Sequence, residues 1–503
     1  VRAEPRATVP GVAHDRGAAA TAADPLLARL LELERLTAPL HPDAEERETL
    51  AEAAFVHAEA LADEVDRGVP SVRDHGDRAI TEFPIGPEPV DAATVFSLLV
   101  RHVDALGMTP HAPGFFGYIP GGNLYHAAIA DFLAAVSNRF TGHFLGSPGA
   151  VRVENQVLRW LGEVVGYPAS ASGSLASGGS LANLSAILAA REAANLRSEQ
   201  VPRAVIYATE HVHHCVPKGL RIAGLGESPL RRVPMDAGWR MDPAALERMI
   251  DEDARAGRIP WLIVASAGTT DAGAVDPLDA IADVAARRRV WLHVDGAYGG
   301  MFALAPEGRR ILAGIERSDS VVLDPHKGLH IPYGVGAVLV KDVRAMRAAH
   351  RFDAAYVPDE AHEVEEPSPS ELSPELSRPF RGLRIWLPLL LLGTRPFEAA
   401  LEEKLLLARY AHRRLLEIPG LEVGPEPDLS IVVFRMAPDR ADADERNDRL
   451  ARALEEDGRA FLSTTRLSGR RFLRLAILAS RTHRQHVDRA IDAIRELSGA
   501  LAG

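Results

Sequence analysis

The sequence predicts an α/β protein with a mostly parallel central sheet covered by helices on both faces. Two observations support this prediction. Between about residues 151 and 340, short β-branched segments alternate with segments of helical length, an arrangement typical of βαβ units. After residue 381, a shorter mixture of strand and helix patterns predicts a small C-terminal α+β domain.

Four regions are expected in chain order. Residues 1–24 are rich in Ala, Pro and Arg and have no apolar core, so we expect a disordered tail and not a signal peptide. Residues 25–110 predict a helical segment, because leucines recur at helical spacing. Residues 111–380 form the expected large α/β domain, and residues 381–503 the small one.

The elements of the two domains follow from local pattern. In the large domain we expect helices over residues 151–165, 181–196, 243–256 and 277–288, and strands over residues 204–209, 261–267, 291–294, 320–323 and 336–340. Residues 363–379 contain four prolines and five glutamates and predict a mobile loop. In the small domain we expect helices over residues 384–416, 445–457 and 486–497, and strands over residues 430–434 and 472–477.

Composition excludes several classes of protein. The formal net charge of −12 argues against a nucleic-acid partner, which would require a basic face. No apolar run approaches about 18 residues, so no membrane helix is expected. The single cysteine, Cys215, can form neither an intramolecular disulfide nor a thiolate metal cluster. A reducing, cytoplasmic location fits best.

Lysine is rare, since only four of the 57 basic residues are lysines. Any chemistry that needs a primary amine is therefore limited to Lys218, Lys327, Lys341 and Lys404. Lys341 precedes Asp342, and Lys404 follows two glutamates on a predicted helix, so both are expected to be solvated. Lys327 differs because it lies in a polar motif directly after a predicted strand, whereas the position of Lys218 stays open.

A Ser-Gly-Gly-Ser segment at residues 177–180 precedes the predicted helix 181–196. Glycines allow a ligand to approach the backbone closely, and the free N–H groups of a helix N-terminus favour an anion such as phosphate. The alternative is a glycine turn in which Ser180 caps the helix. The segment alone leaves both interpretations open.

Three histidines cluster in residues 209–215, after a predicted strand. Their spacing at positions 211, 213 and 214, with no nearby carboxylate triad, is poor for zinc, and no metal site is expected. One imidazole could instead stack on an aromatic ligand. For His211 and His214 the alternative is a solvated loop residue.

Three further polar motifs, at residues 268–273, 293–298 and 324–328, also follow predicted strands. Ligands of open α/β sheets bind beyond the carboxyl ends of the strands, so these motifs are expected to meet. A carboxylate at a buried strand end, such as Asp295, needs a partner. That partner is either a protonated ring nitrogen or a salt bridge or helix cap.

Together the motifs describe one ligand. A lysine amine suits an aldehyde, an aspartate suits a pyridinium nitrogen, a Gly/Ser helix start suits a phosphate, and a flat side chain can stack on a ring. Pyridoxal 5'-phosphate has all of these features. Arginine cannot replace the lysine, because its guanidinium stays protonated and forms no Schiff base.

The sequence resembles the group II pyridoxal-phosphate-dependent amino-acid decarboxylases, the family of aromatic-amino-acid, histidine and glutamate decarboxylases. The resemblance covers roughly residues 50–494, and its matching stretches are residues 114–120, 177–183, 268–270, 293–300, 324–327, 378–386 and 472–477. It implies fold type I, the aspartate-aminotransferase-like fold, and a homodimer with the active site at the subunit interface.

The resemblance also implies roles for the matched residues. Lys327 would form the Schiff base, Asp295 would pair with the pyridinium nitrogen, and His213 would stack over the ring. The other cofactor contacts would come from Gly179, Ser180, Thr270, Ala297 and Asp324, and His326 would lie beside the lysine as a further catalytic residue. Substrate contacts would come from Phe116, Tyr118, Pro120, Gly121 and Arg474, the last holding the carboxylate.

The chain departs from the family at the mobile loop. Many relatives carry a proton-donating tyrosine there, whereas residues 363–379 contain none and Tyr356 lies upstream. We expect a carboxy-lyase that converts an L-amino acid to its amine and CO₂, with His326, His213, a water or a partner residue as donor. An oxidative deaminase that gives an aldehyde, an aminotransferase and a homologue without turnover are the alternatives.

The pocket motifs bear on the substrate. Gly328 follows Lys327 where aromatic-acid decarboxylases usually have tryptophan, and Gly121 and Gly122 follow Pro120. No additional cation is evident for an acidic side chain. We therefore expect an apolar substrate, either aliphatic or aromatic.

Overall fold

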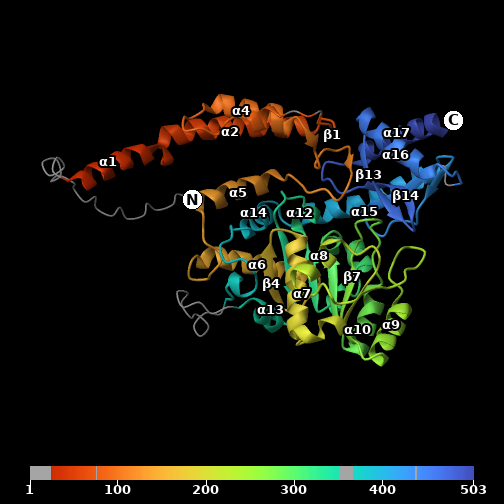
Figure 1. The fold of residues 1–503 in the computed structure, drawn as a ribbon. Helices are drawn as coiled ribbons and strands as arrows, with labels where there is room; N and C mark the ends of the chain where they lie inside the picture. The colour runs from red at the N-terminus through yellow and green to blue at the C-terminus, as the bar shows by residue number, and fades with distance from the viewer. Residues whose placement is uncertain (1–23, 75, 77, 352–365, 437–438, 503) are drawn as a thin grey trace. The chain divides into compact units, whose positions relative to one another are not determined.

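The computed structural model describes residues 24–74, 76, 78–351, 366–436 and 439–502. These residues fall into two compact units (Figure 1). The first comprises residues up to 64 together with 75–105, and the second comprises 65–74 and everything from 106 onward. The predicted tail, apart from Asp24, and Tyr356 lie outside the described residues.

The first unit is helical. Its helices are α1 (Pro25–Thr37), α2 (Ala44–Val65), α3 (Ala79–Glu82) and α4 (Ala92–Leu99), and a π-helical turn, Val100–Asp104, continues α4. Asp24 caps α1 by accepting a hydrogen bond from the Leu26 N–H, and Asp91 caps α4 in the same way through Thr94. No described residue of α1, α3 or α4 is buried within the chain.

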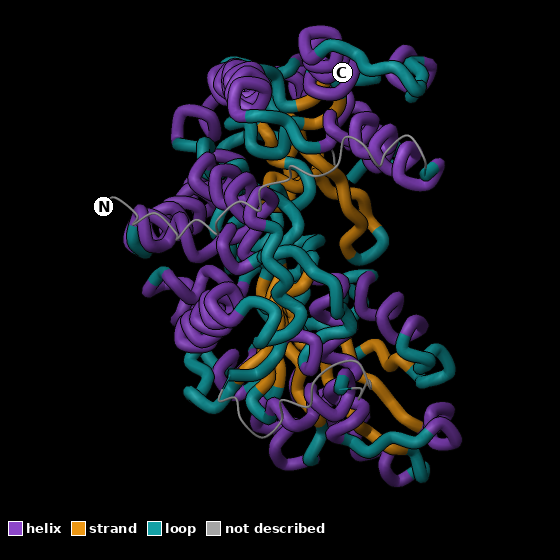
Figure 2. Tube along the Cα trace, turned by 90° about the vertical axis from the view of Figure 1, so that its left-hand side faces the viewer, coloured by secondary structure: helices purple, strands orange, loops and turns teal. Residues whose placement is uncertain are grey.

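The second unit contains both predicted sheets, which are visible as separate groups of strands (Figure 2). The seven-stranded sheet has the order β4-β10-β9-β8-β7-β5-β6. The five strands from β9 to β6 run parallel, while β10 runs antiparallel to both β9 and β4. The strands are β4 (Ser172–Ala176), β5 (Ala204–Ala208), β6 (Leu230–Arg232), β7 (Ile259–Ser266), β8 (Trp291–Gly296), β9 (Ser320–Leu323) and β10 (Gly336–Val340).

Alternating side chains bury the sheet on both faces. On β5, Val205 and Tyr207 join the core that includes helices α9 (Pro243–Arg255) and α10 (Leu278–Arg288). Ile206 and Ala208 pack instead with α7 (Gly179–Ala193) and α8 (Cys215–Ile222). The mostly parallel, doubly covered sheet predicted from the sequence is therefore confirmed.

Two strands of this sheet were not predicted from the sequence. Strand β4 reads Ser-Gly-Ser-Leu-Ala and lacks the β-branched residues that signal a strand, yet all five residues pair with β10. Strand β6 has only three residues and lies at the sheet edge. Gly173 explains the composition of β4, because a Cβ there would lie 1.8 Å from the Val338 carbonyl oxygen.

The C-terminal sheet has the order β11-β12-β14-β13-β3. Strands β11 (Leu421–Val423), β12 (Ile431–Met436), β13 (Phe461–Leu467) and β14 (Arg470–Ala476) come from the C-terminal region, while β3 (Phe115–Phe116) comes from far upstream and pairs parallel with β13. Helices α16 (Ala443–Asp457) and α17 (Arg484–Ala502) pack on this sheet. Strand β13 was not predicted from the sequence.

The single helix predicted over residues 384–416 is wrong. Two helices, α14 (Gly382–Leu392) and α15 (Arg395–Leu416), meet at Gly393, whose φ of 72° lies in the left-handed region that glycine tolerates. Helix α14 packs on α5 (Tyr125–Ser137) and on α6 (Pro148–Val164). The break lets the chain turn away from the large sheet toward the C-terminal one.

The predictions for two lysines are also wrong. Lys404 is fully buried, and its Nζ donates to the carbonyl oxygen of Thr482 at 2.6 Å and to Glu403 at 2.8 Å. Lys341 is half-buried with its Nζ 5.3 Å from the Tyr167 ring centroid, because Asp342 pairs with Arg344 instead. The neighbouring Glu403 is thus one partner of Lys404, but the sequence indicated neither the burial of that amine nor the contact of Lys341 with Tyr167.

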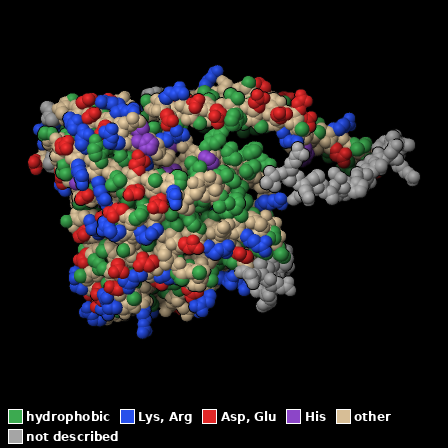
Figure 3. Space-filling view, turned by 180° about the vertical axis from the view of Figure 1, so that it is seen from behind, with side chains coloured by type: hydrophobic (Ala, Val, Ile, Leu, Met, Phe, Trp, Pro, Cys, Tyr) green, Lys and Arg blue, Asp and Glu red, His purple; other side chains and the backbone are tan. Residues whose placement is uncertain are grey.

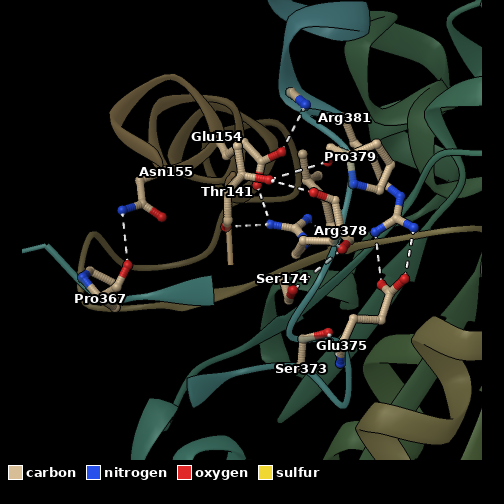
Figure 4. A network of polar contacts seen from close by, with 12 residues as sticks. Thr141, Glu154, Asn155, Ser174, Pro367, Ser373, Glu375, Arg378, Pro379 and Arg381 are labelled. Atoms are coloured by element: carbon tan, nitrogen blue, oxygen red, sulfur yellow. Dashed lines mark hydrogen bonds and ion pairs between the residues drawn. The ribbon is translucent and has the colours of Figure 1, made fainter. Parts of the chain in front are cut away.

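The described part of the predicted mobile loop, residues 366–379, is packed against the body of the second unit (Figure 4). Asn155 donates to the Glu366 carboxylate at 2.7 Å, and the Ser368 hydroxyl accepts a hydrogen bond from the Phe144 N–H at 3.0 Å. Leu372 is buried. The prediction of mobility is wrong for this part, because proline and glutamate content does not reveal buried polar partners, while residues 363–365 lie outside the described residues.

A buried ion pair between Arg378 and Glu154 anchors this segment (Figure 4). Arg378 also donates to the carbonyl oxygen of Leu175 on β4 at 3.0 Å, and Glu154 also accepts from the Gly382 N–H at 3.1 Å. One carboxylate on α6 thus holds together the segment, the start of α14 and the strand that leads to residues 177–180.

We predict that Arg378→Met lowers the free energy of unfolding by about 3–5 kcal/mol, because the buried Glu154 carboxylate loses its counter-charge. Arg344→Met is the matched control, since the Arg344–Asp342 pair is exposed and should contribute less than about 1 kcal/mol. Urea unfolding of the two variants measures the difference. Equal losses would show that the buried pair is not a special anchor.

Candidate active site

A cavity of about 420 Å³ lies at the carboxyl ends of the parallel strands. Nine of the sequence-predicted site residues line it: Gly179, Ser180, His213, Thr270, Asp295, Ala297, Asp324, His326 and Lys327. They come from the segments after β4, β5, β7, β8 and β9, whose carboxyl ends lie at the same sheet edge because β5, β7, β8 and β9 pair in parallel and β10, antiparallel to both β9 and β4, separates those two strands. The predicted convergence of these motifs is therefore seen in the structure.

Lys327 lies on the short helix α12 (Pro325–Gly328), and its Nζ is 2.9 Å from the Asp324 carboxylate. Burial acts to lower the pKa of the Lys327 ammonium, but Asp324 and, more weakly, Asp295 raise that pKa above its ordinary value. Asp324 Oδ1 is buried and has no hydrogen-bond partner among the described residues. The amine and its carboxylate are held as a charged pair at the cavity wall.

Asp295 ends β8 and is 8% exposed. Its Oδ1 accepts a hydrogen bond from the Ala297 N–H at 3.2 Å. Within the described part of the chain, no Arg, Lys or His lies within ion-pair distance of it, so the salt bridge considered from the sequence is not formed. A buried carboxylate without a counter-ion favours a cationic ligand atom.

Two histidines of the cavity have defined hydrogen bonds. His213 Nδ1 accepts from the Cys215 N–H at 3.3 Å, and His326 Nδ1 donates to the Val335 carbonyl oxygen at 2.6 Å. Burial lowers the pKa of each imidazole, so both are neutral near pH 7. His213 therefore carries its proton on Nε2, while the only proton of His326 is bonded to Val335.

The helix start at residues 177–180 has no side-chain cap among the described residues. Gly178, with a φ of 154°, occupies the cap position of α7, and Ser180 lies inside the helix, so the alternative of Ser180 as the N-cap is wrong. A Cβ on Gly179 would lie 2.9 Å from the Asp324 carboxylate. Because no side chain caps α7, its first N–H groups stay free for a ligand.

None of the predicted substrate residues lines the cavity. Phe116 is fully buried in the core of the C-terminal sheet, so its assignment as a substrate contact is wrong. Arg474 does not line the cavity either. Its guanidinium donates to the Asp271 carbonyl oxygen at 3.0 Å, the Ser463 hydroxyl at 2.7 Å and the Tyr118 carbonyl oxygen at 3.2 Å.

The segment around Gly121 lies against the loop after Lys327. Gly121 N–H donates to the Tyr333 hydroxyl at 2.9 Å, and the Gly122 N–H lies 3.2 Å from the His326 carbonyl oxygen. Tyr118 is 54% exposed with a φ of 48°. Neither Tyr118, Pro120 nor Gly121 directly lines the cavity, but Tyr333 does.

Sequence reasoning missed two polar residues of the cavity. His211 is buried, and its Nδ1 lies 3.3 Å from Asp271, so its interpretation as a solvated loop residue is wrong, whereas His214 is exposed. Tyr333 lines the cavity beside Lys327. His211 belongs to a motif already identified, but Tyr333 stands alone in a loop and gives no local signal.

Comparison with known proteins identifies the family. Residues 81–437 match the model of the pyridoxal-dependent decarboxylase conserved domain. The chain belongs to this family. It is 36% identical over 404 residues to the aromatic-L-amino-acid decarboxylase of Bacillus atrophaeus, covering 79% of this chain and 82% of the relative. It is 34% identical over 378 residues to the L-2,4-diaminobutyrate decarboxylase of Rhizobium meliloti (strain 1021), covering 75% of this chain and 76% of the relative.

Solved structures of similar proteins support the same family. Oryza sativa TDC with PLP and tryptamine superimposes with a TM-score of 0.87 at 26% identity and covers 92% of this chain and 99% of its own. The pyridoxal-dependent decarboxylase described here therefore has fold type I, and it is a pyridoxal-phosphate-dependent carboxy-lyase. Family, fold class, enzyme class and cofactor, as expected from the sequence, are confirmed.

The residues present fit pyridoxal phosphate. Lys327 supplies the amine, Asp295 a buried carboxylate without a counter-ion, and Gly179 a close backbone approach at an uncapped helix start. Within the described residues, no helix is long and apolar enough to cross a membrane.

One buried histidine ties the phosphate-side helix to the sheet. His293, two residues before Asp295 on β8, lies 2.8 Å from Asn183 Oδ1 on α7 and 2.9 Å from the Ser320 hydroxyl on β9. Burial lowers the pKa of His293 to about 4. Unfolding restores the ordinary value of about 6.5, so the unfolded chain binds the extra proton between these pH values.

We predict that His293 contributes stability that is complete above about pH 6.5 and is lost as pH falls toward 4, up to about 3 kcal/mol. Urea unfolding at several pH values should therefore show a smaller pH slope for His293→Asn than for the unmodified protein. Asp276, whose pKa burial raises to about 6, acts in the opposite direction but is common to both proteins. The exposed His214→Asn is the control, and an equal slope in it would contradict the assignment.

Proposed function

We propose that this enzyme decarboxylates an L-amino acid with an apolar side chain, aliphatic or aromatic, to the amine and CO₂ through a Schiff base on Lys327. The observation that carries this proposal is the joint presence of Lys327 and the unpaired Asp295 carboxylate in one cavity. Pyridoxal phosphate supplies an electron-withdrawing conjugated ring that accepts the electron pair left when CO₂ departs.

Each residue of the cavity has a definable task. Lys327 provides the amine, and Asp324 holds that amine in place through the ion pair at 2.9 Å. Asp295 keeps a ring nitrogen protonated, since a buried carboxylate stabilises an adjacent cation. Neutral His213 offers a flat face for stacking and an Nε2–H for a carboxylate oxygen.

The remaining matched residues bind and orient. Gly179 and Ser180 offer the free N–H groups of α7 to the phosphate. Ala297 and Thr270 lie in the same cavity, where a methyl group can pack against a ring and a hydroxyl can donate to an oxygen. His326, with its single proton on Val335, offers an acceptor at Nε2 beside Lys327.

The cavity wall favours an apolar substrate side chain. Lys327 is the one Lys or Arg among the lining residues of the described chain, so an acidic side chain would find no other cation. No residue larger than glycine fits at position 328, because a Cβ there would lie 2.3 Å from Met301 Cβ. The ring of Tyr333 offers an apolar surface next to Gly121.

Two other outcomes remain as tests of the proposal. The chain is 28% identical over 406 residues to the phenylacetaldehyde synthase of Arabidopsis thaliana, covering 78% of this chain and 82% of that relative. An aldehyde is therefore one product to search for. Amino transfer to an added keto acid is the other.

We predict that the purified holoenzyme releases equal amounts of amine and CO₂ from at least one apolar member of a panel of twenty amino acids. Aldehyde with peroxide, or turnover that requires a keto acid, would contradict decarboxylation to the amine. Borohydride reduction followed by peptide mapping should place the pyridoxyl group on Lys327. A label on Lys218 would overturn the assignment of the amine, and Lys218→Arg should leave the labelling unchanged.

We further propose a homodimer, located in the cytoplasm. Hydrophobic side chains gather in one field on the face seen from behind (Figure 3). The neighbouring helices α5 and α14 carry large exposed apolar residues, namely Ile129, Phe132, Leu133, Val136, Leu390 and Leu391. Such a cluster is unusual for a monomer and suits a second copy of the chain. The free, buried thiol of Cys215 fits a reducing compartment.

We predict that Val136→Glu, at a side chain 70% exposed on α5, converts a dimer into monomers, because a charge in an apolar interface is left without a partner. Ile222→Glu, at a side chain 62% exposed on α8, is the matched control and should leave the mass unchanged. Sedimentation of both variants measures the assembly. A monomeric unmodified protein would refute the dimer.

A further inference from the structure

The proposed decarboxylation needs a proton donor inside the cavity. When the bond between Cα and the carboxylate breaks, CO₂ leaves and the electron pair stays behind, so Cα must gain one proton to give the amine. This inference rests on the proposed function and asks which residue of the chain delivers that proton.

Three histidines line the cavity, and two of them are poorly suited to this task. The single proton of neutral His326 is bonded to the Val335 carbonyl oxygen at 2.6 Å. His213 carries its proton on Nε2, but burial lowers the pKa of its imidazolium, and a neutral imidazole is a very weak acid. The third, His211, is buried, and its Nδ1 lies 3.3 Å from the Asp271 carboxylate. The cavity tyrosines are a further source of a proton for general-acid catalysis.

Two tyrosines line the cavity, and they differ in what their hydroxyl groups do. Tyr298 is buried, and its hydroxyl is bound to Ser430, 2.6 Å from the Ser430 hydroxyl and 3.0 Å from the Ser430 N–H. Burial raises the pKa of Tyr298 to about 12. The Tyr298 hydroxyl is thus occupied by two contacts with Ser430, and its raised pKa makes the proton hard to release.

The hydroxyl of Tyr333 is arranged in the opposite way. Its oxygen accepts a hydrogen bond from the Gly121 N–H at 2.9 Å, and among the described residues no acceptor takes its own proton. An amide that donates to the oxygen fixes the position of the phenol and also stabilises negative charge on it. Tyr333 thus lines the cavity that contains Lys327, and its positioned O–H has no acceptor among the described residues.

Two contacts fix the backbone and one side of the ring of Tyr333. The Tyr333 carbonyl oxygen accepts a hydrogen bond from Arg384 on α14, and Arg384 is itself paired with Asp131 on α5 at 2.6 Å. A Cβ on Gly121 would lie 2.5–2.9 Å from three ring atoms of Tyr333. The ring thus lies directly against the Gly121 backbone, in a space that only glycine leaves.

We propose that Tyr333 is the proton donor to the substrate Cα. The phenolic O–H bond breaks as the new C–H bond forms, and the phenolate that remains is protonated again by water, to which the half-exposed side chain has access. No oxidation or reduction takes place. The hydrogen bond from Gly121 stabilises the phenolate at the moment when it forms.

The decisive test is Tyr333→Phe, with the amine, CO₂ and any aldehyde measured on the substrate found for the unmodified enzyme. Loss of a general acid should reduce amine formation about 100- to 10,000-fold. Gly121→Ala should cause a similar loss although the phenol is still present, because the added Cβ displaces the ring. Tyr125→Phe, a tyrosine on α5 that does not line the cavity, is the matched control and should keep full activity.

Two further measurements separate proton donation from a merely structural role. In D₂O, the unmodified enzyme should give a single enantiomer of the monodeuterated amine, whereas Tyr333→Phe should give a mixture. Calorimetry should show that Tyr333→Phe binds pyridoxal phosphate and the product amine with unchanged affinity. Retained rate and retained stereochemistry in Tyr333→Phe would overturn the inference and point to Lys327 as donor. An unmodified enzyme that releases no CO₂ would instead refute the proposed function.

Discussion

The ion pair between Lys327 and Asp324 is the interaction on which the site depends. A lysine amine inside a cavity is costly unless a carboxylate compensates it, and Asp324 is 2.9 Å away at the cap of the same short helix. Asp324 in turn lies directly under Gly179, where any Cβ would approach its carboxylate to 2.9 Å. Amine, carboxylate and uncapped helix start are therefore fixed by one close contact.

Buried polar contacts around the site hold Asp324 and Gly179 in place. Strand β4, which leads to Gly179, is held by Arg378 through the Leu175 carbonyl oxygen, and Arg378 is buried against Glu154. His293 on β8 links Asn183 of α7 to Ser320 of β9. Buried polar networks whose hydrogen bonds are satisfied rigidify a fold, and here they fix the elements that carry the cavity residues.

The sequence and the structure agree for cavity residues that lie in short motifs directly after strands. The segments after the strands carry Lys327, Asp295 and His213, and parallel pairing brings them together without any further information. They disagree where partners are distant in sequence. Phe116 and Arg474 belong to matching motifs, yet the first is core and the second is occupied by three protein oxygens. A matching motif shows which region of the fold a residue belongs to. The burial and the contacts of its side chain decide whether that residue can reach a ligand.

The sequence by itself determined the family, the fold class and the cofactor, because each depends on short motifs placed after strands, and it led to the proposal that Lys327 binds the cofactor. Only the tertiary structure decided which side chains face the cavity. Tyr333 and Gly121 are 212 residues apart, and nothing in their local sequences predicts that an amide of one would hold the phenol of the other. The packing of residues 366–379 was hidden for the same reason, since its partners lie on α6 and β4.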